Sequence, residues 1–266
     1  MIELIEIIFL QINNQLSTLQ INDVNQKGFY MKVGNNINVE RAGWSFGGEV
    51  AETFVEHITK SVPMYSQGHE LILQLSDFFC RNDSLCYEIG TSTGELIEKL
   101  ARHNNKKKNI IWTGLDVEEN MVEKALTHCA ANKNIQILCE DINLFEFEKS
   151  DLIVAYYCIQ FVEPRHRQKL IEKIYNSLNW GGAFIMFEKV RAPDARFQDI
   201  ASQMYMEYKL DQGFDEVEIV SKTRSLKSVL EPFSTQGNID LLKRAGFLDI
   251  NTVFKFICFE GFLAIK

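Results

Sequence analysis

The stretch YEIGTSTGEL, from Tyr87 to Leu96, places two glycines four residues apart between a short apolar run and a helical pattern. Because glycine has no Cβ, Gly90 and Gly94 let the backbone approach a ligand closely at a strand-to-helix corner. The spacing is Glu-x-Gly-x-x-x-Gly, not the Gly-x-Gly-x-x-Gly of dinucleotide-binding proteins, and no Lys-Ser or Lys-Thr pair follows as in a phosphate loop. The corner therefore predicts a binding site that favours an adenosyl ligand over a tightly cradled pyrophosphate.

Two acidic residues follow at the ends of the next apolar runs. Asp116 ends the run IIWTGL, and the pair Glu140-Asp141 ends the run IQILC. In an open α/β sheet, ligands bind outside the carboxyl ends of the strands, so we expect both positions beside the glycine corner. Asp116 can accept hydrogen bonds from both hydroxyls of a ribose, and Asp141 is placed to meet the amino group of an adenine. In this order the three features predict that the chain binds S-adenosylmethionine (SAM).

The elements that must position these residues form an alternating pattern. Apolar runs from Leu85 onward alternate with amphipathic stretches at 95–103, 119–131 and 164–178, which is the pattern of βαβ units. We therefore predict an α/β fold whose mostly parallel sheet carries helices on both faces. Further upstream, two helical patterns flank Pro63, which must interrupt any helix.

The last third of the chain departs from this alternation. Residues 192–233 predict a helical insertion with four large side chains at helical spacing, which we expect to face the core. They are Phe197, Ile200, Met204 and Tyr208. A short helix then ends at Gly246. The final segment, FLDINTVFKFICFEGFLAIK, predicts two antiparallel strands at the sheet edge, joined by a turn at the Glu-Gly pair.

Composition argues against several other classes of function. The 266 residues carry a formal net charge of −8, so there is no broad basic field to hold a nucleic-acid backbone directly. The six cysteines form no Cys-x-x-Cys pair and the five histidines lack ligand spacing, so we expect no metal site and a reduced, cytoplasmic environment. The opening MIELIEIIFL is apolar, but it is short and carries two glutamates, so we expect no membrane span.

From about Trp44 onward the sequence resembles the carboxy-S-adenosylmethionine (carboxy-SAM) synthases, a branch of the class I methyltransferase fold. The matching pieces, in order, are SVPMYS, YEIGTSTG, LDVEENM, EDI, IQFVEP, IYNSLNWGGAFIMFEK, KTRSL and LLKRAGF. The resemblance implies a Rossmann-like, mostly parallel seven-stranded sheet with the helical insertion before the C-terminal hairpin. It also implies an enzyme that converts SAM and prephenate into carboxy-SAM and phenylpyruvate, while a separate enzyme later uses the product on a tRNA wobble uridine.

The resemblance divides the chain into two parts. Residues 43–266 form the SAM-binding, methyltransferase-like domain, in which residues 192–233 are the helical insertion and serve as a lid. Residues 1–42 lie outside the resemblance and are rich in Asn, Gln and Ile. We interpret them as an N-terminal appendage of unknown role.

The resemblance also implies which residues contact SAM or carboxy-SAM. They are Tyr65, Gly90, Thr91, Ser92, Asp116, Val117, Asp141, Ile142, Tyr156 and Arg224. Arg224, within KTRSL, would fork onto the carboxylate of the activated cofactor, either from the same chain or from the neighbouring subunit of a homodimer. Arginine suits this role because its planar donors match a carboxylate bidentately.

One position departs from the family's pattern. Tyr156, in VAYYCIQF, stands where the family has an asparagine that contacts the cofactor at the end of the fourth strand. A phenol cannot donate and accept as a carboxamide does, although its ring can face the sulfonium in a cation–π contact. We therefore count Tyr156 among the catalytic residues, together with Tyr65 and Arg224.

Four functions stay open from the sequence. The first is carboxy-SAM synthesis, and the second is methyl transfer from SAM to a small carboxylate or amino-acid-like acceptor that Arg224 would hold. The third is cyclisation of SAM itself to azetidine-2-carboxylate, and the fourth is a SAM-binding regulatory role without turnover. In each enzymatic case the substrate is a small molecule, and the protein acts chiefly by aligning the donor with its nucleophile.

Overall fold

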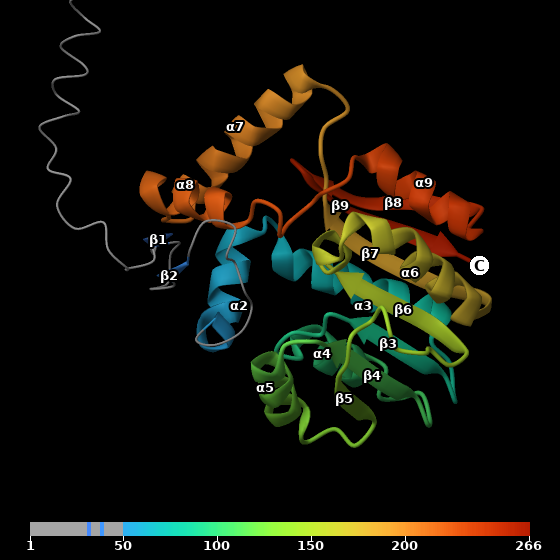
Figure 1. Ribbon diagram of the computed structural model, residues 1–266. Coiled ribbons are helices and arrows are strands. Elements are labelled where there is room, and N and C mark those ends of the chain that lie inside the picture. Colours follow the sequence, from blue (N-terminus) through green and yellow to red (C-terminus); the bar gives the residue numbers. More distant parts are fainter. Residues whose placement is uncertain (1–30, 33–37, 40–49) are drawn as a thin grey trace, which may run out of the picture. The chain divides into compact units, whose positions relative to one another are not determined.

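The computed structural model describes residues 31–32, 38–39 and 50–266, and seven strands form its main sheet (Figure 1). The strand order is β5–β4–β3–β6–β7–β9–β8. The strands are β3 (Leu85–Ile89), β4 (Ile111–Asp116), β5 (Ile135–Cys139), β6 (Ser150–Tyr156), β7 (Leu178–Lys189), β8 (Asp249–Phe256) and β9 (Phe259–Ile265). From β5 to β7 all neighbouring strands are parallel, whereas β9 is antiparallel to both β7 and β8. The predicted mostly parallel seven-stranded sheet is confirmed.

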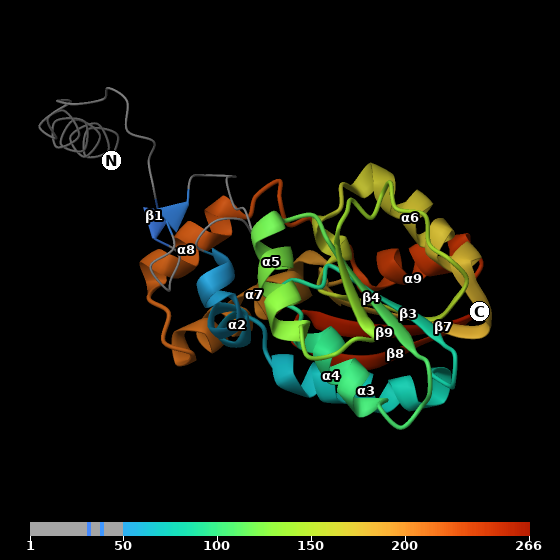
Figure 2. The same cartoon turned by 90° about the horizontal axis from the view of Figure 1, so that it is seen from below.

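Helices cover both faces of this sheet, as the alternation predicted. On one face lie α3 (Tyr65–Phe79), α4 (Glu95–His103) and α5 (Glu119–Cys129), and on the other lie α6 (Pro164–Ser177) and α9 (Thr235–Ala245) (Figure 2). Each helix buries one apolar stripe against the strands, such as Leu96 and Leu100 of α4 or Leu170 and Ile174 of α6. The two layers leave the ends of the strands free for a site.

The topology fixes where that site should be. From β3 the chain proceeds to β4 and β5 on one side, and β6 and β7 then extend the sheet on the other side. The order therefore reverses between β3 and β6. A crevice forms outside the carboxyl ends of the strands at such a reversal, and it lies directly beside the glycine corner that follows β3.

Two helix boundaries follow the predicted signals. The first helical pattern is α2 (Val50–Ser61), which ends just before Pro63, and α3 begins two residues after that proline. The helix α9 ends at Gly246, whose φ of 118° suits only glycine and whose added Cβ would lie 2.8 Å from the ring of Tyr175. Both boundaries therefore have a local cause that is readable from the sequence.

The C-terminal hairpin lies at one edge of the sheet, but its predicted turn was wrong. The turn falls at Ile257 and Cys258, and the Glu-Gly pair lies inside β9. Gly261 is needed there for packing, because an added Cβ would meet the buried ring of Phe187 at 2.6 Å. In the same hairpin the outermost strand is β8, and β9 lies between β7 and β8.

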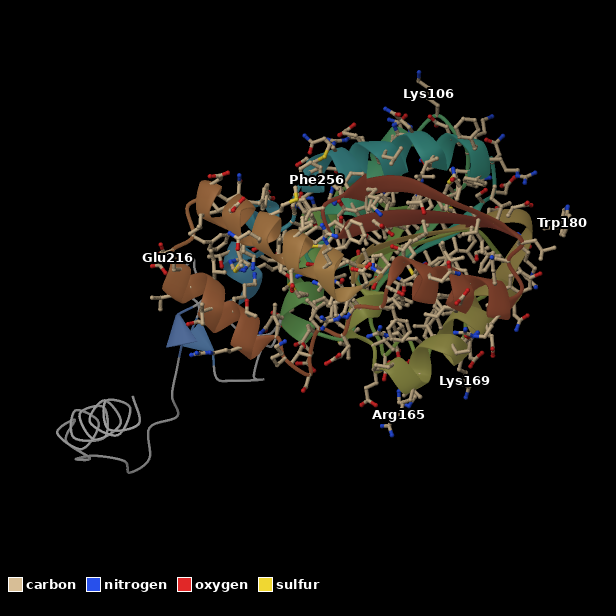
Figure 3. All side chains as sticks on the ribbon, turned by 90° about the horizontal axis from the view of Figure 1, so that it is seen from above. Lys106, Arg165, Lys169, Trp180, Glu216 and Phe256 are labelled. Carbon is tan, nitrogen blue, oxygen red and sulfur yellow. The ribbon has the colours of Figure 1, made fainter. Side chains whose placement is uncertain are left out.

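The predicted helical insertion consists of α7 (Ala195–Asp211) and α8 (Glu216–Ser225). The expectation that its apolar stripe faces the core was wrong. Phe197, Ile200 and Met204 are exposed by 56%, 50% and 48%, and Tyr208 is half-buried. The only side chain that α7 buries fully is Lys209. In Figure 3 the labelled Phe256, the last residue of β8, and Trp180, in β7, lie at opposite ends of the sheet.

The short strands β1 (Met31–Lys32) and β2 (Asn38–Val39) pair with each other antiparallel. Most of the proposed appendage over residues 1–42 lies outside the described residues. In the part of the chain that the structure describes, no helix has the length and hydropathy to cross a bilayer. Within that same part, no three His, Cys, Asp or Glu side chains gather as a metal site would need.

Candidate functional site

A cavity of about 820 Å³ opens at the carboxyl ends of the strands, where the strand order reverses. This volume suits a small-molecule ligand. The structure brings together at this cavity every predicted cofactor residue except Arg224. The predicted residues that line it are Tyr65, Gly90, Thr91, Ser92, Asp116, Val117, Asp141, Ile142 and Tyr156.

The glycine loop is held in place by the chain itself. The backbone N–H groups of Gly90 and Thr91 both donate to the carbonyl of Leu115 at the end of β4, over 2.8 and 2.9 Å. Gly90 has a φ of 71°, and an added Cβ would lie 2.6 Å from Sγ of Cys158. Gly94 has a φ of 84°, and an added Cβ would lie 2.9 Å from Sγ of Cys129 in α5. The glycines therefore permit close packing of the protein as well as approach of a ligand.

Asp116 ties two of the loops around the cavity together. One carboxylate oxygen accepts from the N–H of Ser92 over 2.8 Å, and the other accepts from the N–H of Glu118 over 3.0 Å. Burial raises the pKa of Asp116, and the backbone N–H groups oppose this shift. Each oxygen keeps a further lone pair, so the side chain can still accept bonds from two ligand hydroxyls.

Glu88 is a cavity residue to which the sequence reasoning gave no role. It lies on β3, is almost fully buried, and accepts a hydrogen bond from the hydroxyl of Thr91 over 2.7 Å. Burial raises its pKa to about 8, with a further contribution from Asp116. Its carboxyl group is therefore mostly protonated at neutral pH and can donate a hydrogen bond. An acidic residue inside an otherwise apolar strand was the signal in the sequence.

The loop after β5 is shaped by Asp141. Its carboxylate accepts from the backbone N–H of Asn143 over 2.8 Å and from the side-chain amide of the same residue over 2.9 Å. Lys173 of α6 donates to the carbonyl groups of Asn143 and Phe145. This loop is thus fixed from two sides, beside the position predicted for an adenine.

Aromatic side chains form the wall of the cavity near the end of β6. The hydroxyl of Tyr156 donates to the backbone carbonyl of Tyr65 over 2.6 Å, and the two ring centroids lie 5.1 Å apart. Gly68 of α3 makes room for this arrangement, because an added Cβ would lie 2.2 Å from the hydroxyl oxygen of Tyr156. The hydroxyl of Tyr156 thus already donates its proton to a hydrogen bond within the protein. The ring of Tyr156 is the part that can face a ligand.

Tyr157 is a second residue that the sequence reasoning missed. It lines the cavity, is buried, and has a φ of 58° that is unusual for a bulky residue. Its N–H donates to the carbonyl of Phe187, and its ring packs 4.6 Å from that of Tyr156. Burial raises the pKa values of both phenols well above their usual range, so both stay neutral. No local pattern in the sequence marks this conformation.

Arg224 is the one predicted residue that the structure does not bring to the cavity. It lies on α8, whose buried side includes Lys222 and Ser225. Lys222 donates to the hydroxyl of Ser61 over 3.0 Å and contacts His57, so this side of α8 faces α2. Arg224 lies two positions further along the helix and is exposed. Its contact with a carboxylate stays a prediction.

Comparison with known sequences places this chain among named relatives. A family described as "Methyltransferase domain" matches residues 87–182. A carboxy-S-adenosyl-L-methionine synthase of Staphylococcus epidermidis is 36% identical over 84% of this chain and 97% of its own length. The enzyme of that name from Campylobacter lari is 35% identical over 84% of this chain and 94% of its own length.

Comparison with solved structures supports the fold. A putative O-methyltransferase from Nostoc punctiforme matches with a TM-score of 0.59 and 15% identity, over 82% of this chain and 59% of that one. An O-methyltransferase family protein from Burkholderia thailandensis matches with a TM-score of 0.56 and 13% identity, over 81% of this chain and 59% of that one. Together with the strand order, these likenesses confirm the class I methyltransferase fold.

Proposed function

This chain belongs to the carboxy-S-adenosyl-L-methionine synthase family, and we propose on that premise that it transfers a carboxyl group from prephenate to SAM. One hydrogen of the SAM methyl group is replaced by a carboxylate, which gives carboxy-SAM. Prephenate loses one carboxylate and its ring hydroxyl to become phenylpyruvate. The hydroxyl leaves with the proton of the methyl group as water, so the atoms balance.

The observation that carries this proposal is the convergence of the predicted cofactor residues on one cavity in a member of this family. SAM fits with its ribose on Asp116 and its adenine beside Asp141. Its amino-acid tail lies along the loop from Gly90 to Ser92. The rings of Tyr65 and Tyr156 face the sulfonium, where an aromatic face attracts a cation. The sulfonium already activates its methyl group, so the protein acts by alignment and by exclusion of water.

A homodimer would complete this site. The exposed Phe197, Ile200 and Met204 of α7 form an apolar stripe, and Val217 and Val220 of α8 are also exposed. Exposed apolar surfaces of this kind often mark interfaces between proteins. A second copy that covers this surface would carry its own Arg224 toward the carboxylate in the cavity of the first copy. In this proposal residues 192–233 act as lid and interface, and the enzyme works in the cytoplasm without direct contact to nucleic acid.

Methyl transfer to a small carboxylate acceptor is the second candidate function. The observation that favours it is the state of Tyr156, whose hydroxyl already donates to the carbonyl of Tyr65. It cannot replace the carboxamide that the family has at this position. If this difference abolished carboxyl transfer, Tyr156→Asn should tighten the binding of carboxy-SAM relative to SAM. If instead the ring holds the sulfonium, the same variant should bind SAM more weakly.

Mass spectrometry of the small molecules released from the purified protein tests these functions directly. Carboxy-SAM in the released material, together with phenylpyruvate formed from added SAM and prephenate, would support the first proposal. Release of SAM or S-adenosylhomocysteine alone, without any consumption of prephenate, would refute it and favour methyl transfer. Azetidine-2-carboxylate and methylthioadenosine formed from SAM alone would instead identify a cyclase.

A further inference from the structure

Two lysines meet at one aromatic ring beside the end of β7. Nζ of Lys189, the last residue of β7, lies 4.3 Å from the ring centroid of Tyr205 in α7. Nζ of Lys209, one turn further along α7, lies 4.4 Å from the same centroid. Lys209 is only 6% exposed, and Lys189 is half-buried. Two amino groups thus lie against one aromatic ring, that of Lys209 buried and that of Lys189 half-buried.

A third lysine belongs to the same group. Lys222 of α8 is buried, contacts His57 and donates to the hydroxyl of Ser61. The hydroxyl of Tyr205 donates to the backbone carbonyl of Ser61 over 2.8 Å. Ser61 of α2 therefore contacts both Lys222 and the tyrosine against which Lys189 and Lys209 pack. We call Lys189, Lys209 and Lys222 the lysine cluster.

The lysine cluster is costly to the folded protein. In the part of the chain that the structure describes, neither Lys189 nor Lys209 forms an ion pair with a carboxylate, although the whole chain carries a net charge of −8. Burial, with a smaller contribution from the charge of Lys189, lowers the pKa of Lys209 to about 7. Holding Lys189 and Lys209 both charged at this position is therefore unfavourable. A bound anion would remove this cost.

The lysine cluster lies behind one wall of the cavity. Tyr157 lines the cavity, and its ring packs 5.7 Å from that of Phe259. Nζ of Lys189 lies 5.9 Å from the centroid of the same Phe259 ring. Ile58 of α2 and Val62, the first residue after α2, line the cavity, and Ser61 at the end of α2 contacts the lysine cluster. The two sites therefore share a wall at the carboxyl end of the sheet.

We propose that the lysine cluster binds a carboxylate group of the second substrate, a small organic dianion. This inference rests on the proposed function, in which the second substrate carries two carboxylates. Burial, together with the charges of Lys209 and Lys189, lowers the pKa of Lys222 well below its usual range. A bound carboxylate would favour the protonated forms of the three lysines around it, with the hydroxyl of Ser61 as a further donor. Because Lys209 is the only side chain that α7 buries fully, binding of the anion would also hold α7 against the sheet.

The substitution Lys209→Met tests this role, because methionine keeps the unbranched stem and removes the charge. In the free protein we expect a higher melting temperature, since a buried charge is lost. In the enzyme we expect the KM for prephenate to rise at least tenfold, while the affinity for SAM changes less than twofold. A residue that only supports the structure would not change stability and substrate affinity in opposite directions. Lys209→Gln provides a second variant, and Lys243→Met, at an exposed position in α9, is the matched control.

An unchanged KM in both Lys209 variants would overturn the inference and leave the proposed function intact. If the unsubstituted protein does not consume prephenate, the proposed function fails. The lysine cluster is then tested with malonate, a small dicarboxylate. If malonate raises the melting temperature of the unsubstituted protein but not that of Lys209→Met, the result would support an anion site at the lysine cluster. No rise in either protein would overturn it.

Discussion

Gly68→Ala should destabilise the protein, because the missing Cβ of Gly68 leaves the space that the side chain of Tyr156 occupies. The added Cβ would lie 2.2 Å from the hydroxyl oxygen of Tyr156 and 3.0 Å from the adjacent ring carbon. The ring cannot simply move aside, because it packs against Tyr65, Tyr157 and Phe187 and its hydroxyl is bonded to the carbonyl of Tyr65. The substitution must therefore displace a buried aromatic side chain.

The expected change in the free energy of unfolding is the sum of three contributions. Overpacking costs about 1–3 kcal/mol, and loss of the hydrogen bond from Tyr156 costs about 1 kcal/mol. Alanine in place of glycine inside α3 returns about 1 kcal/mol through helix propensity. We therefore expect Gly68→Ala to lower the free energy of unfolding by about 1–3 kcal/mol.

A double-mutant cycle isolates the contact between Gly68 and Tyr156. In the Tyr156→Asn background the ring is gone, so Gly68→Ala should stabilise that variant by about 1 kcal/mol. The coupling energy would then be about 2–4 kcal/mol, measured from urea unfolding of the four proteins. Gly237→Ala, in α9, is the control, because its Cβ meets other atoms only at 3.4 Å or more. Additive effects, with a coupling near zero, would refute the reasoning.

Three further predictions concern the cavity and Arg224. Asp116→Ala should weaken SAM binding by about 1–3 kcal/mol, roughly five- to a hundred-fold, and an unchanged affinity in calorimetric titration would remove the assigned ribose contact. The raised pKa of Glu88, about 8 against 4.5 when unfolded, contributes stability that is complete below pH 4.5 and is lost as pH rises through 8. The midpoint of urea unfolding should therefore fall less steeply between pH 5 and 9 in Glu88→Gln than in the unsubstituted protein. The same slope in both proteins would contradict this prediction. Arg224→Ala and Arg224→Lys should both keep SAM affinity but lower activity, the alanine variant by roughly a hundred-fold or more, and full activity in Arg224→Ala would exclude the carboxylate contact.

Much of the fold and part of the site could be predicted because their signals are local or follow from chain order. The alternation of apolar runs and amphipathic stretches sets the parallel sheet, and chain order then brings Gly90, Asp116 and Asp141 to one edge. The rest depends on partners distant in the sequence. Gly261 suggested a turn because the contact with Phe187 is invisible in the sequence. The periodicity of α7 is the same whether its apolar side meets the sheet or the solvent, so the stripe at Phe197 was assigned to the core.

The lysine cluster and the positive φ of Tyr157 could not be predicted from the sequence for the same reason. Lys189, Lys209 and Lys222 come from three separate elements, and nothing near each of them in the sequence predicts that they meet. The N–H of Tyr157, whose φ is 58°, donates to the carbonyl of Phe187 on the neighbouring strand β7. Long-range packing, which no single segment encodes, decides both features.

The position of β9 has a consequence for how the protein is made. β9 lies between β7 and β8, although it is later in the chain than either strand. While the ribosome makes α7, α8, α9 and β8, which takes several seconds at about 5–20 residues per second, β7 has no neighbour on that side. The unpaired strand carries Phe184 to Phe187, an apolar run that is completely buried in the finished sheet and is open to wrong pairing until then. The nascent chain is therefore exposed to wrong pairing at β7 in the interval between the synthesis of β7 and that of β9, and a molecular chaperone that covers this strand would help during that interval.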